Sequence, residues 1–307
     1  MDILAMGEPM MEFSEVADPV RGRVYLPGFG GDTSNFAVAA ARQGAKVGYL
    51  TRVGADAFGD EFLKLWQAEG IATDLVVRDP AAPTGIYFIT HTAKGHQFTY
   101  YRKGSAASRI RPEELPEEAL ANLRLLHVSG ISQGISESSC DAVLRAIEVA
   151  RGHGALISYD PNLRLKLWPL PRARAVIHAT AEQADIFLPS LEDAQQLTGQ
   201  TDPDRIIDRY LALGIRLIAL KLGREGVLVA TPTTRERVAG YRVATVDATG
   251  AGDTFDGAFV TQLLRGAPPA EAARYANAAA ALSTTGYGAV APIPTREQVE
   301  AFLREQA

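Results

Sequence analysis

Short apolar runs recur along this chain between stretches of helical periodicity, and this alternation constrains the fold more than any other feature. Continuous apolar runs are typical of parallel strands buried on both faces of a sheet. The stretches between them are amphipathic, and one of them, DAVLRAIEVARGHG, closes on glycines as helices commonly do. Strand alternating with helix predicts a doubly wound α/β fold, with ligands bound beyond the carboxyl ends of the strands. The runs are VGYLTRVG, LRLLHVSG, ALISYD, DIFLPS and LIALKLG.

Two segments interrupt this rhythm. They are MMEFSEVADPVRGRVYLPGF and TGIYFITHTAKGHQFTYYRKGS, and neither contains a helix pattern within its arms. The second segment predicts a hairpin around a Lys94-Gly95 turn. We expect the two segments to form a small separate sheet over the ligand site. The alternative is a pair of surface hairpins that have no role in binding.

Composition and charge exclude several classes of function. The 307 residues carry a formal net charge of −5, whereas a general nucleic-acid binder presents a basic face. No apolar run is long enough to span a bilayer, and the first residues lack the basic start of a secretory signal. Cys140 is the single cysteine, so no intramolecular disulfide forms, which fits a reducing compartment. We therefore expect a cytoplasmic protein with no nucleic-acid or membrane partner.

The stretch DATGAGDTFDG places three glycines and three aspartates before a helical pattern. Free backbone N–H groups and the dipole at a helix N-terminus favour an anion, and glycine lets the backbone approach a phosphate closely. A carboxylate in the same turn suits proton transfer. Asp253 could take a proton from a hydroxyl that attacks a phosphoryl group held by the turn. The alternative is that Asp253 is an ordinary helix-capping aspartate.

DATGAGDTFDGAF resembles the second signature of the ribokinase-like (PfkB) carbohydrate kinases, and GGDTSNFAVAAARQGAKVGYLTRVGADAFGDEF resembles their first. Weaker similarity runs through nearly the whole length. The resemblance implies a sugar kinase that uses ATP and Mg²⁺. It also implies an α/β fold, a three-layer α/β/α core around a central, mostly parallel sheet, with a small β-sheet lid. The core would comprise residues 1–8, 30–83 and 106–307, and the lid would comprise residues 9–29 and 84–105.

The resemblance further implies roles for individual residues. Asp253 matches the catalytic base, and Gly250, Ala251 and Gly252 match the anion hole. The family's NxxE motif near magnesium appears here as Ser190-Leu191-Glu192-Asp193, so both motif positions depart from the commonest form. Asp193 would act on Mg²⁺ directly or through water, and the alternative is a solvated acid at a helix start. The positions that match nucleotide contacts are Ser190, Lys221, Gly223, Gly226 and Asn277.

Two segments bear on the sugar. In QFTYYRKGSAAS, strand alternation places Phe98, Tyr100 and Arg102 on one face and Tyr101 on the other. In SYDPNLRLKLW, Arg164 lies beyond an apolar run, and a guanidinium fork suits a carboxylate. Both segments resemble 2-keto-3-deoxygluconate kinases, which implies transfer to the 6-hydroxyl of that acid sugar. The sugar contacts implied by the resemblance are Gly31, Asn35, Tyr87, Tyr100, Arg102 and Arg164.

Other interpretations of the same residues stay open. Tyr100 and Tyr101 would then simply pack the lid, and Arg164 would contact a nucleotide phosphate. At the level of function, the alternatives are a fructokinase-like kinase of a neutral sugar and a sensor that binds sugar or nucleotide without catalysis. A sensor has no need of the base Asp253. The partners expected for a kinase are an acid sugar and ATP, with an oligomer formed through the lid as a further expectation.

Overall fold

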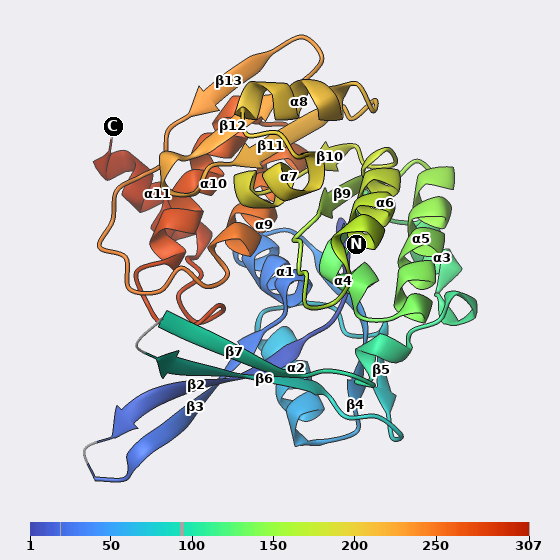
Figure 1. Ribbon diagram of the computed structural model, residues 1–307, viewed down its shortest axis with the longest axis vertical. Helices are drawn as coiled ribbons and strands as arrows, with labels where there is room; N and C mark the ends of the chain where they lie inside the picture. Colours follow the sequence, from blue (N-terminus) through green and yellow to red (C-terminus); the bar gives the residue numbers. More distant parts are fainter. Residues whose placement is uncertain (19, 93–94, 307) are drawn as a thin grey trace.

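The fold is built around one large sheet, with a smaller sheet beside it (Figure 1). The computed structural model describes residues 1–18, 20–92 and 95–306. Within these residues the large sheet has nine strands in the order β13-β12-β11-β10-β9-β8-β1-β4-β5. All neighbouring strands are parallel except the pairs β11–β12 and β12–β13. The strands are β1 (Ile3–Met6), β4 (Val47–Gly54), β5 (Val76–Asp79), β8 (Leu125–Ser129), β9 (Leu156–Asp160), β10 (Ile186–Phe187), β11 (Leu217–Lys221), β12 (Val227–Ala230) and β13 (Arg235–Val238).

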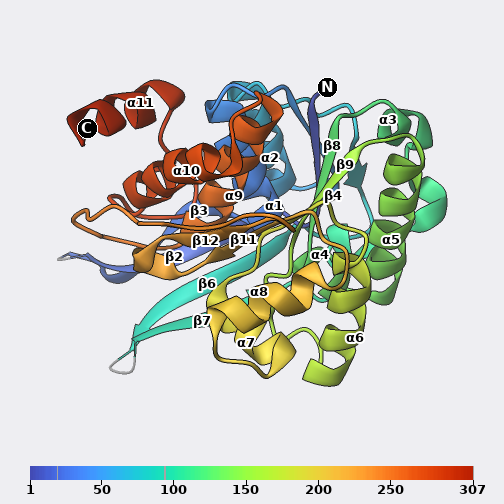
Figure 2. The same cartoon turned by 90° about the horizontal axis from the view of Figure 1, so that it is seen from above.

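Helices cover both faces of the large sheet and enclose an apolar core on each side (Figure 2). Helices α1, α2, α9, α10 and α11 bury one core, and α3, α5, α6, α7 and α8 bury the other. This arrangement confirms the predicted three-layer α/β/α architecture. In the described part of the chain, no helix is long and apolar enough to cross a membrane. The helices are α1 (Asp32–Arg42), α2 (Ala57–Ala68), α3 (Glu117–Ala121), α4 (Gly130–Gly134), α5 (Glu137–Gly152), α6 (Leu170–Ala181), α7 (Leu191–Thr198), α8 (Pro203–Leu211), α9 (Ala251–Leu264), α10 (Pro269–Ser283) and α11 (Arg296–Glu305).

The central strands carry continuous apolar runs because both of their faces are buried. In β1, Ile3 contributes to one core and Leu4 to the other, and both side chains are fully buried. The predicted runs became β4, β8, β9 and β11, and the predicted helix before Gly154 became α5. The run DIFLPS forms only the two-residue strand β10. Pro189 lies in that run and has no N–H to donate to a sheet ladder.

The small sheet contains the two segments that interrupt the strand–helix rhythm. Its order is β3-β2-β6-β7, with an antiparallel hairpin at each side and a parallel pair between β2 and β6. The predicted turn residue Lys94 lies outside the described residues. We refer to this sheet as the lid sheet, although closure over a ligand stays a prediction. Its strands are β2 (Met10–Asp18), β3 (Gly22–Gly30), β6 (Gly85–Thr92) and β7 (Gly95–Tyr101).

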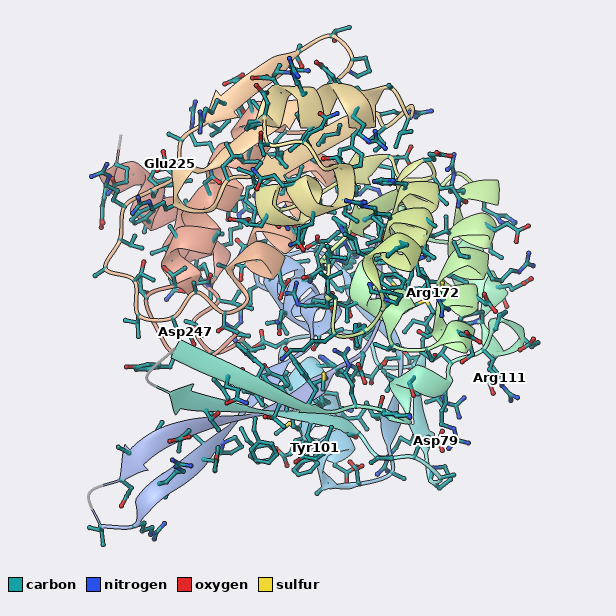
Figure 3. All side chains as sticks on the ribbon, in the orientation of Figure 1. Asp79, Tyr101, Arg111, Arg172, Glu225 and Asp247 are labelled. Carbon is teal, nitrogen blue, oxygen red and sulfur yellow. The ribbon has the colours of Figure 1, made fainter. Side chains whose placement is uncertain are left out.

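Strand β7 confirms the predicted alternation of faces. Phe98 and Tyr100 are half-buried and pack against Met10 and Tyr87 of the same sheet. Tyr101 lies on the opposite face and is 62% exposed (Figure 3). The face that bears Tyr100 lies next to Lys166 of the core, whereas Met11 and Phe13 of the opposite face pack into an apolar core of the large sheet.

Helices α1 and α9 approach each other closely near the carboxyl edge of the large sheet. The contact depends on Gly257 of α9. A Cβ atom at this position would lie 2.7 Å from the Phe36 carbonyl oxygen and 2.9 Å from the Ala40 nitrogen, both in the backbone of α1. Because backbone atoms cannot move aside as a flexible side chain can, only glycine allows this spacing.

We predict that Gly257→Ala lowers stability although alanine is the better helix former. The added methyl group forces α1 and α9 apart, and such overpacking costs about 1–3 kcal/mol. Gly152→Ala is the matched control, because Gly152 ends α5 and a Cβ there meets no atom within 4 Å. Denaturant unfolding should show a loss for the first variant and none for the second. Equal stability of the two variants would contradict the close-packing argument.

Candidate active site

The glycine-rich turn leads into α9, and Asp253 lies in the first helical turn. Gly250 is the N-cap residue, has a left-handed backbone with φ 74°, and makes no side-chain cap. A Cβ at Gly250 would lie 2.9 Å from the Ala289 carbonyl oxygen, so both the backbone conformation and the space require glycine. The helix starts with Ala251, whose N–H bonds the Ala248 carbonyl at 3.2 Å, so the N–H groups of Gly252 and Asp253 are those left for an anion in the described structure. Asp253 is not the capping residue, so that alternative interpretation is wrong.

The carboxyl group of Asp253 is held by α1. Asn35 donates a hydrogen bond of 2.8 Å from Nδ2 to Asp253 Oδ2. Burial, with further contributions from the charges of Asp32 and Asp160, raises the pKa of Asp253 to about 7, although the Asn35 bond and the Lys221 charge oppose this rise. A carboxyl group with a pKa near neutrality is suited to general-base catalysis.

A tight turn positions Asn35. Gly31 precedes α1 with φ 101°, and its carbonyl accepts the Asn35 backbone N–H at 2.8 Å. A Cβ at Gly31 would lie 2.3 Å from the Glu8 carbonyl oxygen, so glycine is required there as well. The predicted residues Gly31, Asn35 and Asp253 thus meet at one place, from segments more than two hundred positions apart in the chain, since Asn35 and Asp253 are separated by 218 residues.

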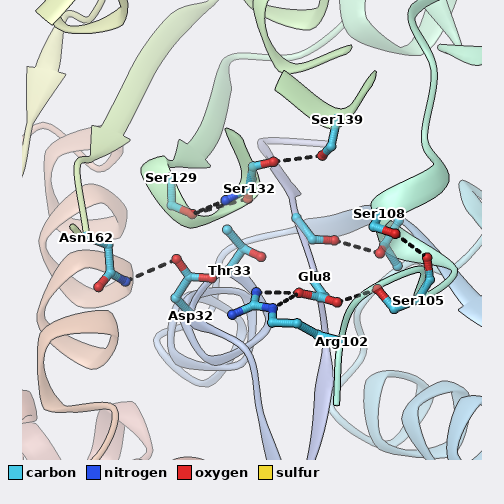
Figure 4. Close-up of polar contacts among 12 residues, drawn as sticks. Glu8, Asp32, Thr33, Arg102, Ser105, Ser108, Ser129, Ser132, Ser139 and Asn162 are labelled. Atoms are coloured by element: carbon cyan, nitrogen blue, oxygen red, sulfur yellow. Dashed lines mark hydrogen bonds and ion pairs between the residues drawn. The ribbon is translucent and has the colours of Figure 1, made fainter. Parts of the chain in front are cut away.

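Asp32 is a further buried acid of this site, which the sequence interpretation did not single out. Its Oδ2 accepts a hydrogen bond of 3.1 Å from Asn162 Nδ2, whereas Oδ1 is buried without a partner (Figure 4). Burial raises the pKa of Asp32, and the charge of Asp160 adds to the rise. An unpartnered buried carboxylate oxygen is costly, and a ligand hydroxyl would satisfy it. The sequence feature that could have indicated a role for Asp32 is the Gly-Gly-Asp run at the start of α1.

The residues expected along the nucleotide line the turn between β11 and β12 and its surroundings. Gly223 and Gly226 have positive φ angles of 59° and 96°, and a Cβ at Gly226 would lie 2.1 Å from the Val238 carbonyl oxygen. Asn277 donates to the carbonyls of Val238 and Ala239 at 3.1 and 3.0 Å. These residues shape the loops at that edge. Their contacts with ATP stay a prediction.

Lys221 lies at the same edge, at the end of β11. Its ammonium group bonds Asp160 at 3.0 Å and both carboxylate oxygens of Asp256 at 2.9 Å. The structure therefore places this predicted nucleotide residue among acidic side chains. Asp256 is a second acid that the sequence interpretation did not single out.

Asp193 and Ser190 lie at the start of α7. Ser190 caps the helix by accepting the Asp193 backbone N–H at 3.1 Å, and Asp193 in turn accepts the Leu163 N–H at 3.1 Å. Burial raises the pKa of Asp193, and the negative charge of Asp160 adds to the rise. A nearby cation would lower the pKa of Asp193 and favour its charged form, which fits a role next to Mg²⁺.

The described part of the chain offers no metal site built from protein side chains alone. Among the described residues, no group of three or more His, Cys, Asp or Glu side chains could hold a metal ion. Mg²⁺ usually keeps several waters and is bound through one or two carboxylates together with substrate phosphates. One carboxylate from Asp193 is compatible with that mode of binding, and the assignment stays a prediction.

On the lid side, Arg102 is paired with a buried acid. Its Nε donates to Glu8 Oε2 at 2.7 Å and its Nη2 donates to the same oxygen, while Ser105 Oγ donates to Oε1 at 2.5 Å (Figure 4). The side chain of Glu8 is fully buried in the loop after β1. The pair therefore joins the end of the lid sheet to the core. The sequence interpretation quoted MGEPMMEF but did not assign a role to Glu8.

The two predicted tyrosines differ in their surroundings. Tyr87 is buried and donates to Glu12 Oε2 at 2.5 Å, and burial raises its pKa above the ordinary range. Tyr100 is half-buried, and the charged ends of Arg102 and Lys166 lie 5.7 and 5.6 Å from its ring centre. Tyr100 therefore lies between a lid residue and a loop of the core.

Arg164 lies in the loop after β9, on the core. Its side chain is exposed, and Nη1 donates to the Leu163 carbonyl at 2.9 Å. Its charge lowers the pKa values of Asp32 and Asp193, so it is close to both. Within the described residues no carboxylate forms an ion pair with Arg164. Its guanidinium group keeps donors that a ligand could use.

Comparison with known proteins agrees with the geometry of the site. The model of the pfkB family carbohydrate kinases matches residues 2–296. The chain belongs to this family, and it is a sugar kinase. The fold also matches the crystal structure of a putative ribokinase II from E. coli in complex with ATP and Mg²⁺, with a TM-score of 0.92, 28% identity and coverage of 99% of both chains.

Relatives of two substrate classes are similar over their whole length. The 2-dehydro-3-deoxygluconokinase of Bacillus subtilis (strain 168) is 34% identical over 313 residues, covering 100% of this chain and 96% of the relative. The probable fructokinase-4 of Arabidopsis thaliana is 32% identical, covering 98% and 96%. Similarity alone therefore assigns the reaction type and leaves the sugar undecided.

We predict that Asp253→Asn lowers turnover by roughly 10²–10⁴-fold, because the amide keeps the size of the carboxylate but cannot accept the proton. ATP binding should persist and is measured by direct titration. For the wild type, kcat/KM should decline as the pH falls through about 7, because the base is then protonated. A variant that retains wild-type turnover would contradict the assignment.

The raised pKa of Asp253 also predicts the stability of the Asp253→Asn variant, which serves as a control for folding. The folded-state pKa of Asp253 lies above the ordinary value of 3.8, so its contribution to stability is greatest at low pH and is lost as the pH rises through about 7. Asp253→Asn should therefore melt at the wild-type temperature or above it at pH 8. A variant that is both inactive and unfolded would not count as support for the base.

Proposed function

We propose that this sugar kinase transfers the γ-phosphoryl group of ATP to the 6-hydroxyl of 2-keto-3-deoxygluconate, giving 2-keto-3-deoxy-6-phosphogluconate. The observation that carries the proposal is Arg164. Its guanidinium group lies by the acidic edge of the sheet, bonds a backbone carbonyl and has no carboxylate partner within the described residues. An acid sugar brings such a partner, because the guanidinium fork donates to a carboxylate through two bonds.

The proposed mechanism follows from the arrangement of α1 and α9. ATP supplies the phosphoryl group, and Mg²⁺ neutralises part of the phosphate charge when both are bound. Asp253 accepts the proton of the 6-hydroxyl, while Asn35 holds the carboxyl group in place. The N–H groups at the start of α9, in the Gly250–Gly252 turn, stabilise the negative charge of the transferring group.

The length of the sugar then determines where its carboxylate lies. With the 6-hydroxyl at Asp253, C1 is at the far end of the molecule, toward the lid. Tyr100 lies on that side, and Arg102 adds a charge held by Glu8, whereas the hydroxyl of Tyr87 donates to Glu12. Supporting the same proposal, the relative from Bacillus subtilis is a 2-dehydro-3-deoxygluconokinase.

One observation favours a neutral sugar as the second candidate. Arg102 was expected to contact a carboxylate, but two of its three guanidinium nitrogens already donate to Glu8. An arginine neutralised in this way contributes less attraction to a second carboxylate. The similarity to a probable fructokinase points the same way. Fructose would then use Arg102 only through hydroxyl groups.

We predict that Arg164→Leu separates the two candidates. Loss of a charge-assisted bond of about 1.5–3 kcal/mol should lower kcat/KM for 2-keto-3-deoxygluconate by roughly 10–100-fold. Use of fructose should change far less, because fructose has no carboxylate. The measurement is kcat/KM of both proteins with both sugars. A wild type that prefers fructose, or an equal loss for the two sugars, would refute the acid-sugar assignment.

The role of Arg102 has to be tested with a different set of variants. Replacing Arg102 alone would leave the carboxylate of Glu8 buried and unpaired, which destabilises the fold for reasons unrelated to the substrate. The Arg102→Leu substitution is therefore compared with Glu8→Gln alone and with the double variant. A loss specific to the acid sugar in the double variant, beyond that of Glu8→Gln, would show that Arg102 contacts the carboxylate.

A further inference from the structure

A buried ion cluster joins three separate elements directly behind the anion-hole turn. It consists of Lys221 at the end of β11, Asp160 at the end of β9 and Asp256 in α9. The side chain of Lys221 is 13% exposed, and those of Asp160 and Asp256 are 8% and 1% exposed. We refer to these three residues as the lysine cluster.

The donors of Lys221 are used within the cluster. An ammonium group has three N–H donors. Three carboxylate oxygens lie within hydrogen-bond distance of Nζ, both oxygens of Asp256 at 2.9 Å and Asp160 Oδ2 at 3.0 Å. Two buried carboxylates thus hold the ammonium and balance its charge, so it attracts a phosphate less than an unpaired lysine would. Its effect on bound groups would act through its position and its charge.

The lysine cluster is built against the catalytic turn. A Cβ added to Gly252 would lie 3.6 Å from Lys221 Nζ, so the ammonium adjoins the last residue of the anion-hole turn. Asp256 follows Asp253 by three positions, which places the two carboxyl groups on one face of α9. Fixing Asp256 to the sheet therefore fixes the rotation of α9, and with it the direction of Asp253 and of the first N–H groups.

The cluster also balances charge. Burial raises the pKa of Asp256 well above its ordinary value, whereas the Lys221 charge holds the pKa of Asp160 below its ordinary value despite burial, so the cation is balanced mainly by Asp160. Without the lysine, two buried acids would face each other close to Asp253. The other groups that act on the Asp253 carboxyl group are Asp32 and Asn35 from α1, Asp160 from β9, Tyr87 from β6 and Lys221 itself.

We propose that Lys221 is a positioning residue for phosphoryl transfer: held by Asp160 and Asp256, it fixes the first turn of α9 and places a positive charge beside that turn, without binding the nucleotide. The proposal rests on the proposed role of Asp253 as the base. It replaces the expected contact between Lys221 and ATP with an indirect role. The identity of the sugar does not enter the argument.

The test compares Lys221→Met with Lys221→Arg, using whichever sugar the wild type prefers. Loss of the positive charge should lower kcat by roughly 10–100-fold and leave the Kd of ATP within about threefold of the wild type. The acidic limb of the pH profile of kcat/KM should move upward by roughly one to two pH units, since a nearby opposite charge shifts a pKa by that much. Lys221→Arg keeps the charge and should return the limb toward its wild-type position.

Several outcomes would overturn the proposal. One is a rise in the Kd of ATP for Lys221→Met that matches the loss in activity, with an unmoved acidic limb, since Lys221 would then bind the nucleotide. Another is wild-type activity and pH dependence in Lys221→Met. Should that variant fail to fold, the double variant Lys221→Met with Asp256→Asn removes the cation together with one acid and must show the same upward shift.

Failure of the proposed base can be told apart from failure of this inference. An active Asp253→Asn variant would refute the base itself, whatever Lys221 does. An inactive Asp253→Asn variant together with an unmoved limb in Lys221→Met would leave the base intact and refute only the role of the lysine.

Discussion

The close contact between α1 and α9 is the constraint on which the rest of the site depends. Both helices start at the carboxyl edge of the large sheet, and Gly257 lets their backbones meet without an intervening side chain. That spacing brings Asn35 within 2.8 Å of Asp253. The proposed base, its hydrogen-bond donor and N–H groups of a helix start are thereby assembled from two helices. A parallel sheet favours this, since its strand ends and helix starts gather at one edge.

Crowding of acids at that edge gives Asp253 its chemical character. Asp32 and Asp160 lie close enough to raise its pKa, while Asn35 and Lys221 oppose them, and the balance leaves the carboxyl group titrating near pH 7. A surface aspartate would be ionised but weakly basic. Burial makes the carboxylate a stronger base, and the positive charge of Lys221 offsets part of the effect of Asp32 and Asp160 on its pKa.

The lid sheet contributes through contacts that cross from it to the core. Arg102 is bonded to the buried Glu8, and Lys166 of the core donates to the Phe98 carbonyl of β7 at 3.3 Å. The face of the lid sheet that bears Tyr87 and Tyr100 is thus held toward the site. The class of sugar then depends on which guanidinium groups can still bond a carboxylate of the ligand. Arg102 already donates to Glu8, whereas Arg164 bonds only a backbone carbonyl in the described structure.

The sequence by itself determined the layers of the fold, the interruption by the lid segments and the place of Asp253 at a helix start. These depend on local periodicity and on glycine positions, which neighbouring residues encode. Only the tertiary structure decided which side chains meet: Glu8 pairs with Arg102, and Asp160 and Asp256 pair with Lys221. It also decided that one oxygen of Asp32 is buried without a partner. Asn35 and Asp253 are 218 residues apart, and no local pattern reports which side chains meet after such a separation. Their meeting, and the burial that raises the pKa of Asp253, result from how the helices pack on the sheet.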